Sequence, residues 1–184
     1  IRDADFETKK QKCDDAFARV EKLNETLKLP VIIMGGSPAF SVHCKRKKIE
    51  CSPGTFIYWD KGYTDLCPEQ KFLPAAVLVT RVISLPTSSR LCLDLGHKSV
   101  AAENEIGKRV FFLTAPELKA VSQSEEHLVV EAGEGHLYKP GNVLYGLPYH
   151  ICPTVALYES LSTIENGNIT GEWRNVARDR KISL

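Results

Sequence analysis

The chain has 184 residues, of which 43% are hydrophobic and 26% are charged, and its formal net charge is +1. This composition is typical of a globular protein and argues against intrinsic disorder. A net charge so close to zero gives no electrostatic reason to expect nucleic acid or an anionic membrane as a partner. No segment approaches the roughly 20 consecutive apolar residues that cross a bilayer. We therefore expect no nucleic-acid partner and no membrane partner.

The cysteines are even in number, which permits a disulfide framework in a secreted protein. The chain begins with Ile1-Arg2-Asp3, which does not resemble a secretory signal. We therefore expect reduced thiols and a cytoplasmic location. Because no initiator Met is present, we also expect a fragment or a processed product. The cysteines are scattered along the chain, at Cys13, Cys44, Cys51, Cys67, Cys92 and Cys152.

The first sixty residues have the pattern of an α/β protein. Apolar residues spaced three and four apart predict an amphipathic helix that ends before Pro30. The segment Pro30–Met34 is apolar without alternation, which predicts a strand buried on both faces, as in parallel sheets. Thr55–Trp59 follows a Ser-Pro-Gly turn and is expected to be a further strand. The apolar positions of the helix are Phe6, Cys13, Phe17, Val20, Leu23 and Leu27.

From about residue 75 the sequence consists of short β segments joined by polar turns. Asn166-Gly167-Asn168 supplies a turn signal before the last segment. Several short strands in succession predict a compact antiparallel barrel or sandwich. The expected strands are Val77–Ile83, Leu91–Asp94, Arg109–Leu113, His127–Val130 and the segment from Ile169 to Val176.

His150-Ile151-Cys152, held between Pro148 and Pro153, indicates half of a metal site. In an extended segment, residues two apart point to the same side, so the imidazole and the thiolate could bind one ion. Nitrogen and sulfur ligands favour zinc, and two protein ligands leave coordination positions open for catalysis. The alternative is that both side chains only pack, since a buried cysteine usually behaves as a small hydrophobe.

Gly35-Gly36-Ser37 follows the predicted strand directly and forms a second candidate site. Glycines at the carboxyl end of a strand let backbone N–H groups approach an anion, and the serine hydroxyl can add a donor. In a β/α barrel, this end of the strands commonly binds cofactor phosphate. The alternative is a tight turn that requires a positive φ.

Taken in order, six motifs resemble the carboxyl half of the D-threonine aldolase and D-serine dehydratase family. The resemblance runs from about Val31 to Arg178, and the His-x-Cys-Pro-Thr block is its most specific part. Tyr149 stands where the family pattern leads us to expect Asn. The motifs are Gly35-Gly36-Ser37-Pro38, Pro53–Tyr58 with Asp60, Asp94-x-Gly96-x-Lys98, Glu125-Glu126-His127, Pro148–Val155 and Ala177-Arg178.

The resemblance implies an α/β plus β fold: the last units of a pyridoxal-phosphate-binding β/α barrel, as in alanine racemase, followed by a small, mainly antiparallel β domain. We expect the barrel part at residues 1–65 and the β domain, with the metal site, at 66–184. Gly35, Gly36, Ser37 and Tyr58 would bind the cofactor. His150 and Cys152 would bind a divalent metal, zinc by preference. Nothing in the chain matches the motif of the family's Schiff-base lysine.

The resemblance further implies a lyase that acts on a D-amino acid with a β-hydroxyl group. The cysteine at position 152 favours a D-serine dehydratase, because a carboxylate at that ligand position is associated with the aldolases. D-threonine aldolase, a non-catalytic metal-stabilised β module and a metal-free racemase-like enzyme are the alternatives. We expect the complete protein to be a homodimer.

Overall fold

The computed structural model describes residues 1–179, and residues 180–184 lie outside the described part. The chain divides into two compact units, Ile1–Ala76 and Val77–Leu184. The expected assignment of residues 1–65 and 66–184 to two domains stays a prediction, since it concerns the complete protein. No helix among the described residues is long and apolar enough to span a membrane. All six cysteines are free thiols.

The first unit begins with α1 (Phe6–Leu27), which confirms the helix predicted from the apolar spacing. The side chain of Asp5 caps its first turn by accepting the Thr8 N–H at 2.8 Å. The helix ends at Lys28, whose φ of 52° is left-handed. Its buried face, with Cys13 at the centre, packs against the short helical segment of residues 37–43.

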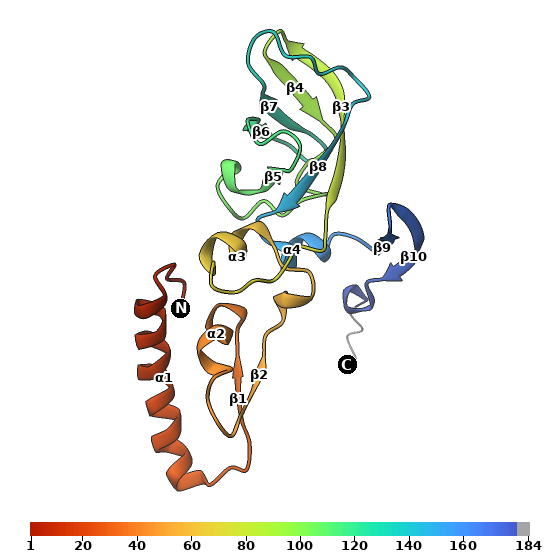
Figure 1. Cartoon of the computed structure of the whole chain (residues 1–184). Coiled ribbons are helices and arrows are strands. Elements are labelled where there is room, and N and C mark those ends of the chain that lie inside the picture. Colours follow the sequence, from red (N-terminus) through yellow and green to blue (C-terminus); the bar gives the residue numbers. More distant parts are fainter. Residues whose placement is uncertain (180–184) are drawn as a thin grey trace. The chain divides into compact units, whose positions relative to one another are not determined.

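Strands β1 (Ile32–Gly35) and β2 (Ile49–Ser52) form a parallel pair in which Gly35 lies opposite Ser52. They are connected by η1 (Ser37–Ala39) and α2 (Phe40–His43) (Figure 1). Because the strands are parallel, the loops after Gly35 and after Ser52 leave the pair at the same end, the carboxyl end of both strands. The predicted burial on both faces is wrong for this chain, since Ile33 is 60% exposed.

The strand predicted at Thr55–Trp59 is also wrong. This segment forms η2 (Thr55–Ile57), in which the carbonyl of Thr55 accepts the N–H groups of Tyr58 and Trp59. Asp60 then caps α3 (Lys61–Leu66) by accepting the Tyr63 N–H at 2.7 Å. These local hydrogen bonds outweigh the β propensity of the aromatic residues.

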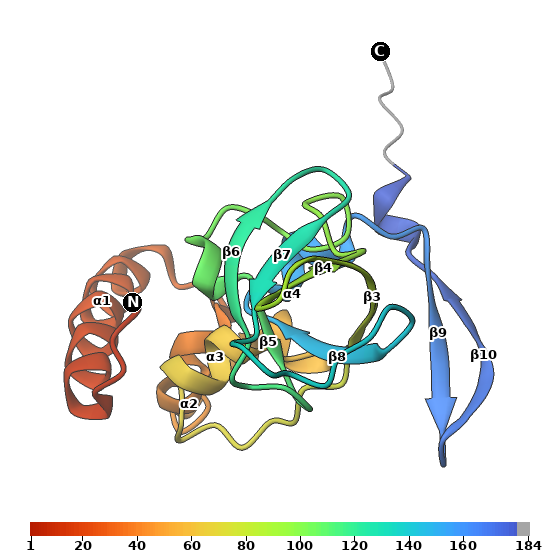
Figure 2. The same cartoon turned by 90° about the horizontal axis from the view of Figure 1, so that it is seen from above.

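The second unit contains a six-stranded antiparallel sheet in the order β5-β8-β3-β4-β7-β6. The sheet curls around its own core, as the view in Figure 2 shows. The change from a parallel pair to antiparallel strands confirms the predicted fold class. The strands are β3 (Leu78–Thr87), β4 (Arg90–Leu93), β5 (Val110–Phe112), β6 (Lys119–Gln123), β7 (Leu128–Glu131) and β8 (Val143–Pro148).

Alternate residues of these strands point inward and form the core of the second unit, which explains the period of two in their burial. The short helix η3 (Ile106–Lys108) precedes β5. The core side chains with at most 1% exposure are Val82, Leu91, Leu93, Leu95, Val100, Ala115, Leu128 and Val130.

After β8 the chain forms α4 (Ile151–Val155), and then a separate hairpin of β9 (Ser160–Glu165) and β10 (Asn168–Arg174). The turn at Asn166-Gly167 has positive φ at both residues, 51° and 78°. This is the type I′ geometry that an Asn-Gly pair favours. The last described element is η4 (Val176–Arg178).

Candidate functional site

The first candidate site lies at the carboxyl ends of β1 and β2. Gly36 has a φ of 90°, and a Cβ placed on it would meet no atom within 4 Å. The Ser37 side chain is buried, and its Oγ accepts the Thr55 N–H at 3.1 Å. Gln70 Nε2 donates to the Ser37 carbonyl at 2.8 Å. The parallel pairing thus brings the loop after β1 and the loop after β2 into direct contact.

This arrangement fits a phosphate-binding loop. Gly36 presents open backbone at the carboxyl end of a parallel strand, which is the geometry that lets an anion approach N–H groups. The Ser37 hydroxyl uses an acceptor position for Thr55 and keeps its own proton for donation. The sequence analysis did not identify Thr55 as a residue of this site, because it placed Thr55 in a strand. The assignment of Gly35, Gly36 and Ser37 to the cofactor stays a prediction.

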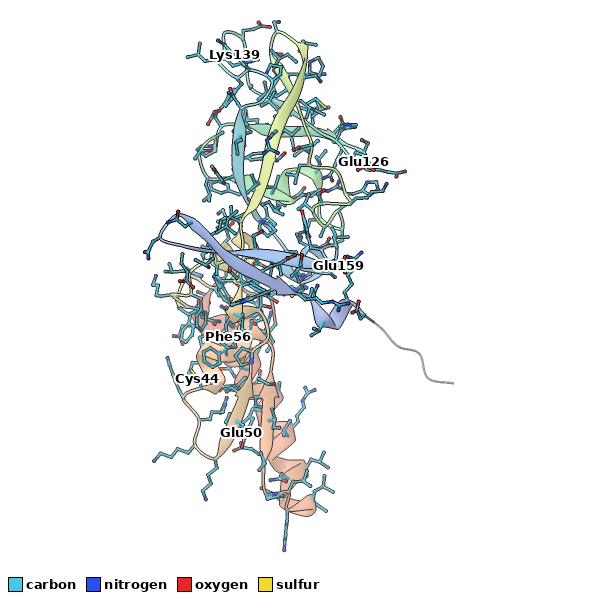
Figure 3. All side chains as sticks on the ribbon, turned by 90° about the vertical axis from the view of Figure 1, so that its right-hand side faces the viewer. Cys44, Glu50, Phe56, Glu126, Lys139 and Glu159 are labelled. Carbon is cyan, nitrogen blue, oxygen red and sulfur yellow. The ribbon has the colours of Figure 1, made fainter. Side chains whose placement is uncertain are left out.

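Tyr58 lies in the same loop, half-buried, at the end of η2. Its carbonyl accepts the Ala75 N–H at 2.7 Å, which fixes the backbone there. The next residue, Trp59, is fully buried, and its ring centroid lies 5.1 Å from that of Phe72. Phe72 also contacts Phe56, which Figure 3 labels, at 5.9 Å between centroids. Aromatic packing therefore holds the loop that carries Tyr58, whose role at the cofactor stays a prediction.

The second candidate site lies at the amino end of α4. His150 is the N-cap residue, and Cys152 is in the first turn with an exposed side chain. The predicted extended conformation through Cys152 is therefore wrong. Pro153 is tolerated in a first helical turn, where its missing N–H has no helical partner. His150 and Cys152 remain the proposed metal ligands.

The imidazole of His150 contacts a carboxylate from a distant part of the chain. Its Nδ1 lies 2.5 Å from Oε1 of Glu103, and both side chains are partly exposed. Sequence reasoning missed Glu103, because the two residues are 47 positions apart and no local pattern connects them. The contact places a second functional group beside the predicted ligand.

A buried hydroxyl joins the segments that carry these two residues. Thr154 is 1% exposed, and its Oγ1 donates to the His150 carbonyl at 2.7 Å. The same oxygen accepts the Ala101 N–H at 3.2 Å. Tyr158 adds a second connection by donating its hydroxyl to the Ser99 carbonyl at 2.8 Å. Burial raises the pKa of Tyr158, so its hydroxyl stays protonated for this bond.

The donor set at α4 suits the expected metal. Imidazole nitrogen and thiolate sulfur are ligands that zinc accepts, and two protein ligands leave positions for substrate. Within residues 1–179, no group of three or more His, Cys, Asp or Glu side chains is arranged to hold a metal ion. The donor types of His150 and Cys152 are compatible with zinc, and their assignment as metal ligands stays a prediction.

Two other family motifs, Asp94-x-Gly96-x-Lys98 and Glu125-Glu126, pack on one another. The N–H of Lys98 donates to the Glu125 carbonyl at 3.1 Å, and its Nζ contacts the carboxylates of Glu125 and Glu126. These side chains are exposed, and Glu126 projects outward in Figure 3. Asp94 accepts hydrogen bonds from Thr80 and Arg81. The two motifs thus pack against each other at the surface of the second unit.

The comparisons with known proteins agree with this picture. Residues 75–164 match the model of the family described as "Putative serine dehydratase domain". The resemblance drawn from the motifs is confirmed. A D-threonine aldolase from Arthrobacter sp is 29% identical over 132 residues, which are 70% of this chain and 34% of that protein.

Solved structures confirm the fold over nearly the whole chain. The crystal structure of D-threonine aldolase from Filomicrobium marinum has a TM-score of 0.83 at 20% identity, and the match covers 97% of this chain and 50% of that chain. A D-threo-3-hydroxyaspartate dehydratase with a histidine changed to alanine has a TM-score of 0.74 at 16% identity. This match covers 91% of this chain and 50% of that chain. The chain therefore spans about half the length of these solved relatives.

A further structure of the dehydratase also has a similar fold. It has a cysteine changed to alanine and is in the metal-free form, with a TM-score of 0.66 at 17% identity over 83% of this chain and 46% of that chain.

Proposed function

We propose that the full-length protein is a lyase that depends on pyridoxal phosphate and a divalent metal and acts on D-amino acids with a β-hydroxyl group. D-serine is the proposed substrate, with pyruvate and ammonia as products. The observation that carries the proposal is the His150 and Cys152 pair at the amino end of α4, within a chain that matches the family model and the fold.

The two candidate sites divide the work of such a reaction. When bound, pyridoxal phosphate supplies an electron sink for negative charge at the α-carbon. Gly36 and Ser37 would hold its phosphate through backbone N–H groups and the serine hydroxyl. Thr55 keeps the Ser37 side chain in place.

His150 and Cys152 would bind the metal that acts at the β-carbon of the substrate. A metal held there supplies Lewis acidity at the β-hydroxyl group of the substrate. His150 would donate a ring nitrogen and Cys152 its thiolate, and Thr154 fixes the backbone of His150. Because the site would offer two protein ligands, positions remain for the substrate oxygen. Zinc is the proposed metal, because the thiolate sulfur of Cys152 would be a soft ligand.

D-threonine aldolase activity is the second candidate, and two observations favour it: the similar protein from Arthrobacter sp and the similar structure from Filomicrobium marinum both have that name. Cysteine as the proposed second ligand favours the dehydratase, because the dehydratase structure in the metal-free form has a cysteine replaced by alanine. Both reactions use the same metal position, so the ligands alone do not decide between them.

Product analysis separates the candidates. The full-length protein is incubated with D-serine and with D-threonine, and pyruvate, ammonia, glycine and acetaldehyde are measured by coupled dehydrogenase assays. We expect pyruvate and ammonia from D-serine and little glycine from D-threonine. Glycine and acetaldehyde as the main products would establish the aldolase instead. Turnover of neither D-amino acid, with zinc and cofactor supplied, would contradict the proposal.

A further inference from the structure

We infer that Glu103 is a positioning residue that holds the imidazole of His150 in the tautomer required for metal binding. The inference deepens the proposed function and rests on it, because it takes His150 as a metal ligand. It concerns a residue outside all six motifs of the sequence analysis.

The contact favours one tautomer. Beside an ionised Glu103, which can only accept hydrogen bonds, the Nδ1 of His150 at 2.5 Å would be the protonated ring nitrogen. In a neutral imidazole, the lone pair is then on Nε2. Metal-binding histidines commonly donate their other N–H to a carboxylate, which fixes the ring and makes the ligand nitrogen more basic. Glu103 and His150 have this arrangement.

The surrounding structure supports the contact. The Thr154 hydroxyl binds the His150 carbonyl and the Ala101 N–H together, and it is fully enclosed. Ala101 lies two positions before Glu103, so the segment carrying the carboxylate is fixed to the helix that carries the metal ligands. Tyr158 ties the same segment at Ser99. A surface ion pair without such support would be expected to fluctuate.

The first experiment measures zinc affinity in the full-length protein at pH 8 by competition with a chromophoric chelator. Glu103→Ala should weaken zinc binding about 10-fold to 100-fold, the range seen when the carboxylate partner of a ligand histidine is removed. Glu103→Gln keeps an acceptor oxygen at the same place and should recover part of the affinity. Glu105→Ala is the matched control: it removes an exposed carboxylate that pairs with Lys108, and zinc affinity should not change.

The second experiment observes the imidazole without metal. Nitrogen-15 NMR of the metal-free protein at pH 8, with the His150 signals assigned by substitution, reports which ring nitrogen carries the proton. We expect the Nδ1–H form in the wild type and in Glu105→Ala, and a shift toward the Nε2–H form in Glu103→Ala. A purely structural role for Glu103 would not change this distribution.

The outcomes separate the inference from the proposed function. Tight zinc binding in the wild type, with unchanged affinity and tautomer in both Glu103 variants, would overturn the inference and leave the proposed function standing. A wild type that binds no zinc would overturn the metal site and the inference together. Weakened binding in Glu103→Ala, partial recovery in Glu103→Gln and the tautomer shift would together support the inference.

Discussion

A Cβ at Gly96 would lie 2.0 Å from the carbonyl oxygen of Glu125. The opposing atoms belong to the backbone, so no side-chain rotation can relieve this contact. Gly96→Ala should therefore lower the free energy of unfolding by about 3 kcal/mol or more, which is at the upper end for overpacking. Gly107→Ala, where a Cβ meets nothing within 4 Å, is the control and should change stability little. Chemical denaturation of both variants is the measurement. Equal stabilities of Gly96→Ala and Gly107→Ala would contradict the close packing of Gly96 against Glu125.

The buried ion pair of Lys9 and Glu69 gives a prediction about pH. Lys9 is fully buried and its Nζ lies 2.8 Å from Glu69, which also accepts the Ser41 hydroxyl at 2.7 Å. Burial raises the pKa of Glu69, but the hydrogen bonds from Lys9 and Ser41 outweigh it, so the pKa lies below its usual value. The pair therefore stabilises the fold above the unfolded-state pKa of about 4.3, and this contribution is lost as the pH falls through the folded-state pKa.

Lys9→Met should cost about 3 kcal/mol at pH 7, because it leaves a partly buried carboxylate without its cation. In the variant, Glu69 loses the hydrogen bond and the charge of Lys9 and keeps burial and the Ser41 hydrogen bond, so its pKa should rise above that of the wild type. The cost should therefore shrink as the pH falls toward 4. The control is Lys10→Met, since the ammonium of Lys10 pairs with Asp14 on the surface. Unfolding free energies at pH 7 and pH 4 test this; a cost that does not change with pH would contradict the assignment.

Local sequence signals predicted part of the fold well. The spacing of apolar residues predicted α1, and Asn166-Gly167 predicted the hairpin turn. Strand β8 (Val143–Pro148) was missed because Gly146 and Pro148 lower its strand propensity, and its pairing with β3 and β5 is a tertiary effect. Three other short strands, β2, β6 and β9, were missed as well.

The Thr154 hydroxyl provides the next prediction. Thr154→Val keeps the shape of the side chain but leaves the buried Ala101 N–H without its acceptor. An unsatisfied buried donor costs about 1–3 kcal/mol, so stability should fall by that amount. Zinc affinity should fall as well, because His150 loses its backbone support. Thr170→Val, on an exposed strand, is the control and should affect neither quantity. Unchanged zinc affinity in a destabilised Thr154→Val protein would limit this residue to a role in folding.

The phosphate loop can be tested with a pair of glycines that have similar backbone conformations. Gly36 and Gly133 have φ values of 90° and 81°, and a Cβ on either would meet no atom within 4 Å. Alanine at either position should therefore introduce similar backbone strain. Only Gly36→Ala should weaken pyridoxal phosphate binding, by about tenfold or more, because it obstructs the approach of an anion to the backbone. Cofactor titration by absorbance is the measurement, and equal effects would argue against a phosphate site at Gly36.

The candidate sites were only partly accessible from sequence. The residue types and spacing of His150 and Cys152 were enough to propose a metal site, but their local conformation was not predicted. Pro153 was the available signal, since proline is tolerated in the first turn of a helix. Glu103 reaches His150 only through the folding of the second unit, where Thr154 holds Ala101. Contacts over such separations depend on tertiary structure, which a single sequence does not reveal.

The most direct test of the central claim is turnover of D-serine by the full-length protein before and after exhaustive chelation, with the pyridoxal absorbance recorded in the same sample. We expect chelation to abolish turnover and leave the absorbance in place, because the electron sink and the hydroxyl activation have separate sites. Added zinc should restore activity in the wild type and not in Cys152→Ala, which lacks one of the two proposed ligands. Full activity after chelation, or in Cys152→Ala, would contradict a metal-dependent reaction at His150 and Cys152.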